Sequence, residues 1–188
     1  MKIYIITGPI GSGKTEVQKI LDKLGYECYC ADAMVQKIYS REEIISEMNK
    51  IFPEYVSNNS IDLETIRNHI FDDNKKRIEL EKYMQPKVFE EFNNIIKQSK
   101  SETIFFILPI IEKNDFSGKY KSIYIEADEE IRLQRIIKRK TYNIQLSKKI
   151  IKLQNSIDKN KDNSDYYITN NDSFLKLEKS VMELITKL

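Results

Sequence analysis

Residues 8–15, GPIGSGKT, follow the spacing G-x-x-x-x-G-K-[ST] of a phosphate loop, and their types suit one kind of chemistry. Glycine lets successive backbone N–H groups point inward and surround phosphate oxygens. The lysine supplies charge for β- and γ-phosphates, and the hydroxyl after it can hold Mg²⁺. We therefore expect an ATP site with Lys14 in a catalytic role and Thr15 as the metal ligand. The predicted nucleotide-binding residues of this loop are Gly8, Pro9, Ile10, Gly11, Ser12, Gly13, Lys14 and Thr15.

Such a loop has this meaning only between a strand and a helix. Residues 2–7, KIYIIT, form a β-branched and aromatic run that is typical of a buried strand. After the loop, apolar residues recur at helical spacing from Val17 to Leu24, and Gly25 suits the end of that helix. The context therefore favours a phosphate loop over a glycine-rich turn that matches by chance.

Four further strands are predicted from short apolar runs separated by helical patterns. This alternation predicts an α/β fold with three layers and a five-stranded parallel sheet, and the phosphate loop makes it a P-loop NTPase-like fold. Ligands collect at the carboxyl ends of the strands in such a sheet, so residues just after strands are the candidates for function. The four additional strands are expected at residues 26–30, 103–108, 121–126 and 165–169.

Asp32 lies just beyond the second predicted strand. Its carboxylate could accept a hydroxyl proton or help to hold Mg²⁺, and the alternative is that it caps the next helix. Many phosphate-loop proteins place a magnesium-binding Asp at the end of a strand such as 103–108. Ile107 and Leu108 occupy those places here. This difference disfavours a GTPase or motor ATPase and directs attention to Asp32.

Arg135 and Arg139 lie four residues apart on the helix predicted after strand 121–126. They share one helix face, and a guanidinium can bind phosphate through two N–H groups. The alternative is a solvated charged face. Asn170, after the last strand, could contact a nucleotide base, although turn formation would also explain it.

The remaining segments suggest how the single domain is divided. Residues 32–99 show an almost wholly helical pattern, too long for a simple crossover, in which Pro86 should kink or divide a long helix. Ser173 should cap a final helix that turns Phe174, Leu177 and Val181 toward the core. We expect a core of residues 1–31, 101–138 and 162–188, a helical substrate subdomain at 32–100, and a lid at 139–161.

Composition narrows the class of protein. The chain has 188 residues, 40% hydrophobic and 32% charged, with a net charge of +2. These values fit one globular domain and give no sign of a nucleic-acid or membrane surface. No signal peptide or membrane span is evident, so we expect a cytoplasmic protein in which Cys28 and Cys30 are reduced thiols. The sequence leaves the oligomeric state open.

The order of these motifs resembles the dephospho-CoA kinase family nearly from end to end. GPIGSGKT is similar to its GGIGSGK[ST], and LGYECYCADAMV to its LG-x-x-V-I-D-A-D-x-I-A. Residues 61–73 resemble its segment that ends L-R-x-x-I-F. LPII is similar to its P-L-L signature, and RLQRIIKR to the stretch with its lid-side arginines. The stretch from 153 to 171 resembles Q-x-x-x-x-x-K-R-x-x-A-D-x-V-I-x-N. It places Gln154, Lys161, Asp165 and Asn170 on family positions.

The resemblance implies transfer of the ATP γ-phosphoryl to the ribose 3′-hydroxyl of dephospho-CoA, with Mg²⁺. It aligns Asp32 with the base of the family, and Arg135 and Arg139 with arginines that neutralise charge. The chain departs from the family at Cys30, Gln85 and Lys113, in the coenzyme-binding and lid regions. Two alternatives remain at this point: another small-molecule or nucleoside kinase, and a nucleotide-binding regulator without catalysis.

Overall fold

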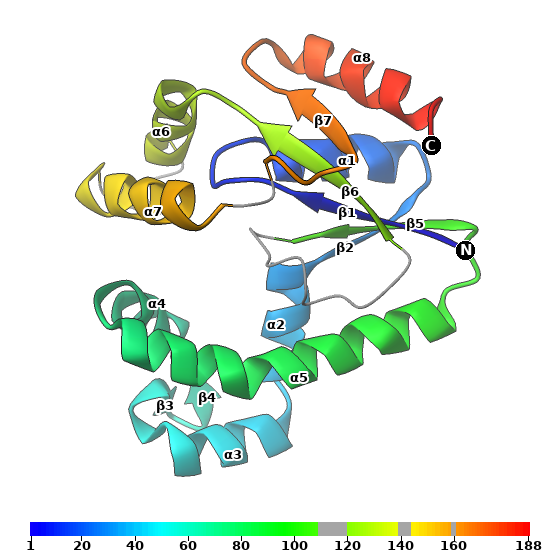
Figure 1. The fold of residues 1–188 in the computed structure, drawn as a ribbon. Helices are drawn as coiled ribbons and strands as arrows, with labels where there is room; N and C mark the ends of the chain where they lie inside the picture. Colours follow the sequence, from blue (N-terminus) through cyan, green and yellow to red (C-terminus); the bar gives the residue numbers. More distant parts are fainter. Residues whose placement is uncertain (109–119, 139–143, 159–160) are drawn as a thin grey trace. The chain divides into compact units, whose positions relative to one another are not determined.

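The chain folds into two compact units in the computed structural model, which describes residues 1–108, 120–138, 144–158 and 161–188 (Figure 1). The first unit joins Met1–Cys30 to Ser101–Leu188, and the second is Ala31–Lys100. Each unit has its own apolar core.

The first unit is built on a five-stranded sheet with the order β2-β5-β1-β6-β7, in which all pairs are parallel. This confirms the predicted parallel sheet of an α/β fold. Ile3 pairs with Ile104 on one side and with Tyr120 on the other, so β1 is the central strand. The loop that leaves its carboxyl end therefore starts in the middle of the sheet. The strands are β1 Lys2–Thr7, β2 Glu27–Cys30, β5 Thr103–Ile107, β6 Tyr120–Glu126 and β7 Tyr166–Thr169.

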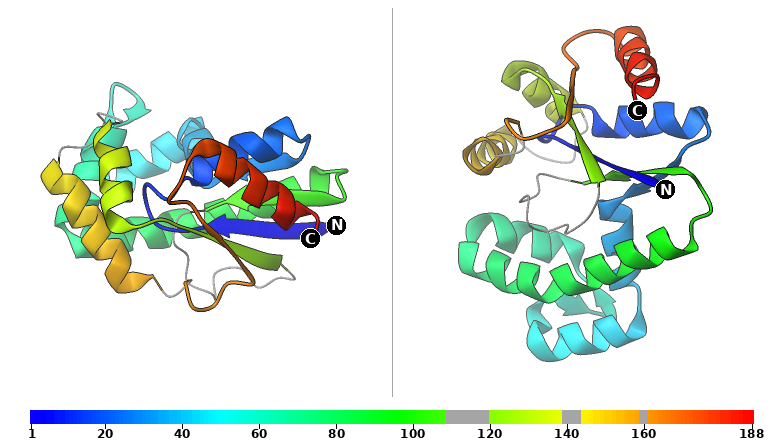
Figure 2. Two further views of the ribbon diagram at one scale, coloured as in Figure 1. Left: turned by 90° about the horizontal axis from the view of Figure 1, so that it is seen from above. Right: turned by 45° about the vertical axis from the view of Figure 1, so that its right-hand side comes forward.

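Helices α1 (Lys14–Lys23) and α8 (Phe174–Ile185) lie side by side and pack on one sheet face (Figure 2). Leu177 and Val181 of α8 are buried there, as predicted. The prediction for Phe174 is wrong, because this side chain is 49% exposed at the first residue of the helix. Ser173 takes the N-cap position, but its side chain makes no capping hydrogen bond.

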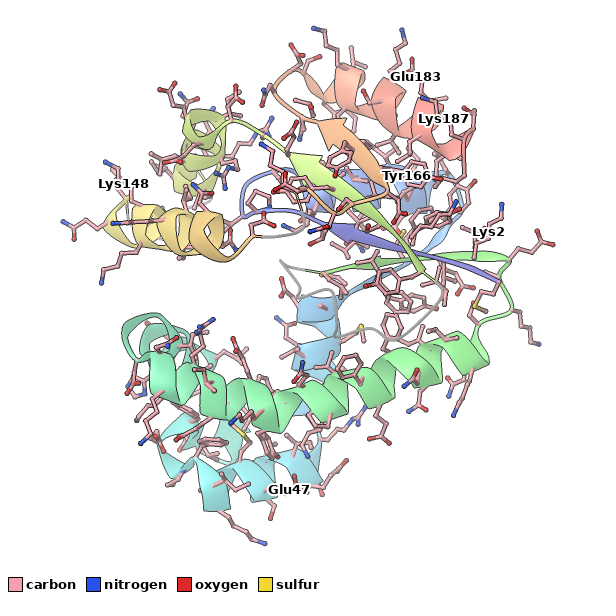
Figure 3. The ribbon with its side chains drawn as sticks, viewed as in Figure 1. Lys2, Glu47, Lys148, Tyr166, Glu183 and Lys187 are labelled. Carbon is pink, nitrogen blue, oxygen red and sulfur yellow. The ribbon has the colours of Figure 1, made fainter. Side chains whose placement is uncertain are left out.

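Helices α6 (Glu129–Lys138) and α7 (Ile144–Ile157) form a second pair in this unit (Figure 1). Ile136 of α6 and Ile150 and Ile151 of α7 are buried. Lys148 of α7 is exposed and points away from the sheet (Figure 3). Because β6 and α6 are separated by only two residues, α6 starts at the carboxyl end of the strand.

The second unit is helical, with a small hairpin that the sequence pattern did not predict. Strands β3 (Val56–Ser57) and β4 (Ser60–Ile61) pair antiparallel across Asn58 and Asn59. Both asparagines have positive φ, 50° and 57°, as a tight hairpin turn requires. The other elements are α2 Ala31–Tyr39, α3 Glu42–Ile51, the 3₁₀ turn η1 Pro53–Tyr55, α4 Leu63–Asp72 and α5 Asn74–Gln98.

Helix α5 continues through Pro86, so Pro86 does not divide this helix, and the alternative of a kink stays a prediction. Proline removes one hydrogen bond from the helix ladder and its ring crowds the carbonyl four residues earlier, and tertiary packing of the helix can compensate for this cost. Leu80, Met84 and Phe92 are buried along the helix. Among the residues that the structure describes, no helix has the length and apolar character needed to cross a membrane.

Candidate active site

The phosphate loop lies between β1 and α1, and Lys14 is the first residue of that helix. The lysine Nζ donates hydrogen bonds to Gly8 O at 2.6 Å and Pro9 O at 3.1 Å. The side chain is half-buried and folds back over its own loop. The positive charge is thus held beside the N–H groups at the helix N-terminus, where anions are favoured.

Asn170 braces this loop from the end of β7. The residue is 5% exposed, and its Nδ2 donates to Ser12 O at 2.7 Å. Gly13 faces the same amide, with φ +106°, and a Cβ on it would lie 2.1 Å from Asn170 Nδ2. Position 13 therefore needs glycine both for its backbone conformation and for space. The predicted contact of Asn170 with a base stays a prediction.

Helix α6 packs directly against the loop. A Cβ on Gly11 would lie 2.8 Å from the carbonyl oxygen of Arg132. Arg135, one turn further on, places Nη1 3.4 Å from Gly11 O and Nη2 3.4 Å from Asn170 Oδ1. These contacts are long for N–H···O hydrogen bonds, so the guanidinium lies beside the loop without a tight bond to these two oxygens. The structure thus brings Lys14, Arg135 and Asn170 together.

Helix α7 also reaches the loop, through Gln154. The Oε1 atom of Gln154 accepts a hydrogen bond from Ile10 N at 2.7 Å. The two residues are 144 positions apart in the chain. No local pattern could have predicted this contact, and the sequence marked Gln154 only through the family resemblance. The loop is therefore held from β7, α6 and α7.

Comparison with known proteins agrees with this geometry. A sequence model of the dephospho-CoA kinase family matches residues 3–176. The chain belongs to the dephospho-CoA kinase family. A dephospho-CoA kinase of Fusobacterium nucleatum is 33% identical over 190 residues, covering 96% of each chain.

Solved structures share the fold of this family member. A protein of Thermus thermophilus has a TM-score of 0.84 at 23% identity and covers 100% of this chain and 97% of its own. A dephospho-CoA kinase from Campylobacter jejuni has a TM-score of 0.69 at 24% identity, with the same coverage. At these identities the structural likeness concerns the fold alone.

Asp32, which the family resemblance marks as the base, is the second residue of α2 in the second unit, and it is exposed. The interpretation of Asp32 as the N-cap is wrong, because the helix begins one residue earlier, at Ala31. An acidic residue in a first helical turn still interacts favourably with the helix dipole. Its role as a base stays a prediction. Arg139 lies outside the described residues.

Thr15 could contribute to a magnesium site. It is exposed in the first turn of α1, and its hydroxyl oxygen is a hard donor of the kind that Mg²⁺ prefers. The described residues contain no group of three or more His, Cys, Asp or Glu that could hold a metal. The residues fit a Mg²⁺ ion that takes its other ligands from phosphate and water.

The two cysteines lie on β2 and are free thiols. Burial, with a smaller contribution from Asp22, raises the pKa of Cys28 to about 12. Cys28 is therefore a protonated thiol at neutral pH, which is unsuited to act as a nucleophile.

Proposed function

We propose that this protein is a dephospho-CoA kinase that transfers the γ-phosphoryl group of ATP to the ribose 3′-hydroxyl of dephospho-CoA, giving ADP and coenzyme A. One observation carries the proposal: the family match over residues 3–176 includes a phosphate loop that is folded between a central strand and a helix. The oligomeric state is open, and a cytoplasmic location stays a prediction of the sequence.

The loop would position the phosphoryl group that is transferred. Its backbone N–H groups and Lys14 bind β- and γ-phosphate oxygens, and the fixed loop holds them for attack by the acceptor oxygen. Thr15 would hold Mg²⁺, which when bound neutralises phosphate charge. Asn170, Arg135 and Gln154 contact the loop and support its shape.

The acceptor hydroxyl needs a base, and Asp32 is our candidate. Its carboxylate would orient the 3′-hydroxyl and take its proton as the oxygen attacks the γ-phosphorus. The bond between the γ-phosphorus and the β–γ bridging oxygen breaks, and ADP leaves. Arg135 and Arg139 would neutralise charge on the transferring group.

A substrate panel tests this proposal. The purified protein is incubated with ATP and Mg²⁺, and with dephospho-CoA, shikimate or nucleosides in separate reactions. Mass spectrometry detects phosphorylated product, and phosphorus NMR assigns the phosphate to the ribose 3′ position. We expect coenzyme A from dephospho-CoA and no product from the other acceptors. Absence of 3′-phosphorylated product would contradict the proposal, whereas ADP release alone would show only background hydrolysis.

A further inference from the structure

Arg132 of α6 carries a buried positive charge that is only partly paired. The residue is 4% exposed, and its Nη2 donates to Asn155 Oδ1 at 3.1 Å. Within the part of the chain that the structure describes, its Nε and Nη1 are buried and have no hydrogen-bond partner. Charged side chains are seldom buried unless they are paired, because desolvation of a charge is costly. Among the described residues, no carboxylate therefore pairs with this guanidinium.

Arg132 lines a cavity of about 540 Å³ in the first unit. The cavity wall includes Pro9 of the phosphate loop, the end of β6 with the turn after it, the carboxyl-terminal part of α7, and Lys161. This volume lies in the range of small-molecule sites. The cavity is thus a place where a ligand could meet the guanidinium.

The other charged groups of the wall are four carboxylates and Lys161. One of the wall carboxylates, Asp128, is exposed. The Nζ atom of Lys161 lies 3.4 Å from the carboxylate of Glu126. The unmet hydrogen-bonding capacity lies in Nε and Nη1 of Arg132, so a ligand that reaches them should offer negatively charged acceptor oxygens. The other three carboxylates already accept hydrogen bonds: Glu126 from Thr169 Oγ1 at 2.8 Å, Glu129 from Asn155 Nδ2 at 3.0 Å and Asp158 from Tyr124 OH at 2.5 Å.

The position of Arg132 ties such a ligand to the phosphate loop. Its backbone packs against Gly11, and its partner Asn155 follows Gln154, which binds Ile10 N. We propose that Arg132 binds a phosphate group of a substrate in this cavity, an inference that rests on the proposed kinase function. Both substrates carry phosphates, ATP as a triphosphate and dephospho-CoA as a diphosphate. The planar guanidinium fork matches phosphate oxygens. Nε and Nη1 are shielded from water in this structure, so phosphate binding by these donors would require the guanidinium to turn toward the cavity.

Arg132→Met separates this role from a structural one. Methionine keeps a long side chain but removes the charge, and loss of a partly paired buried charge should leave the melting temperature equal or higher. We expect phosphate binding to weaken by roughly 10- to 100-fold, the range for a lost charge-assisted hydrogen bond. Calorimetry with ATP and steady-state kinetics with dephospho-CoA identify which substrate loses affinity. Lys148→Met, on the exposed side of α7, is the matched control and should behave like the parent (Figure 3).

Inorganic pyrophosphate makes the test independent of turnover. If the parent makes no coenzyme A, the proposed function fails, but a lower pyrophosphate affinity of Arg132→Met would still support the site. If Arg132→Met keeps the parental affinities for ATP and pyrophosphate and the parental KM for dephospho-CoA, the proposed phosphate site at Arg132 is overturned. Should Arg132→Met fail to fold, Arg132→Lys takes its place. Lysine keeps the charge without the fork, so binding should still weaken by about 10-fold, and parental affinities would refute the proposal.

Discussion

The polar side chains around the phosphate loop bind backbone atoms, whereas the main polar cluster of the second unit joins side chains to one another. Asn170, Gln154 and Lys14 each hydrogen-bond to a peptide group of the loop. In the second unit, the buried Glu91 of α5 accepts hydrogen bonds from Lys37 and Arg41. The first arrangement fixes the shape of a binding loop, and the second joins helices. We therefore expect changes at the loop contacts to alter ligand binding, and changes in the cluster of Glu91, Lys37 and Arg41 to alter stability.

Lys14→Ala should give the largest effect. In the proposed mechanism the variant loses the charge that stabilises the transferring phosphoryl group, so kcat should fall by at least ~10²–10³-fold, as for other lost transition-state donors. Two hydrogen bonds to the loop also disappear, which should cost about 1–3 kcal/mol of unfolding free energy. Coupled ADP-release kinetics and a thermal melt on one preparation measure both. Normal turnover by the folded variant would remove the loop from the mechanism.

Gly13→Ala tests whether the brace of Asn170 shapes the loop. The added methyl would lie 2.1 Å from Asn170 Nδ2, so either the loop or the asparagine must move. Nucleotide affinity should fall by at least about 10-fold, equivalent to about 1.4 kcal/mol. Gly25→Ala is the matched control, since Gly25 also has positive φ (+85°) but a methyl group added there would meet nothing within 4 Å.

The control should lose only stability, about 1–2 kcal/mol for the strained backbone, and keep parental nucleotide affinity. Equal affinities of Gly13→Ala and Gly25→Ala in a nucleotide titration would show that the close contact with Asn170 has no role in binding.

Glu91→Gln should give the smallest effect on ligand binding and a clear loss of stability. The side chain of Glu91 is 7% exposed, and removal of its charge should cost about 1–3 kcal/mol. Lys37 and Arg41 hold the pKa of the Glu91 carboxyl below its ordinary value of 4.5. This stabilisation is complete above that value and is lost as pH falls through the lower pKa of the folded state.

Thermal melts at neutral and acidic pH check this linkage. The difference in melting temperature between the parent and Glu91→Gln should become smaller below pH ~4.5, because a protonated glutamate resembles glutamine. A difference in melting temperature that stays constant with pH would show that the ion pairs of Glu91 contribute nothing to stability. A large loss of nucleotide affinity at neutral pH would contradict the division between binding and stability.

The sequence predicted the parts of the fold that local patterns control. Strand β1 was placed at its observed bounds, and Leu177 and Val181 of the last helix are buried as predicted. The hairpin at Asn58 and Asn59 was missed because two-residue strands are too short to show a period.

The contacts of the candidate site also divide into those made by residues near in sequence, which the sequence shows, and those between distant residues, which it does not. The phosphate loop was visible because its residues are consecutive. The hydrogen bonds of Asn170 and Gln154 to it span 158 and 144 positions, so only the folded chain reveals them. The buried, partly paired guanidinium of Arg132 likewise depends on packing around α6, which the spacing of arginines cannot show.

Asp32→Asn tests most directly whether this family member is an enzyme that uses a carboxylate base. Asparagine keeps the size of the side chain but cannot accept the hydroxyl proton, and the exposed Asp32 should tolerate the change structurally. On one preparation, a thermal melt, an ATP titration and formation of 3′-phosphorylated product are measured. We predict parental stability and ATP affinity with at least a ~100-fold fall in kcat, the lower end of the ~10²–10⁴-fold range for general-base catalysis. Unchanged 3′-phosphate formation by Asp32→Asn would contradict the assignment.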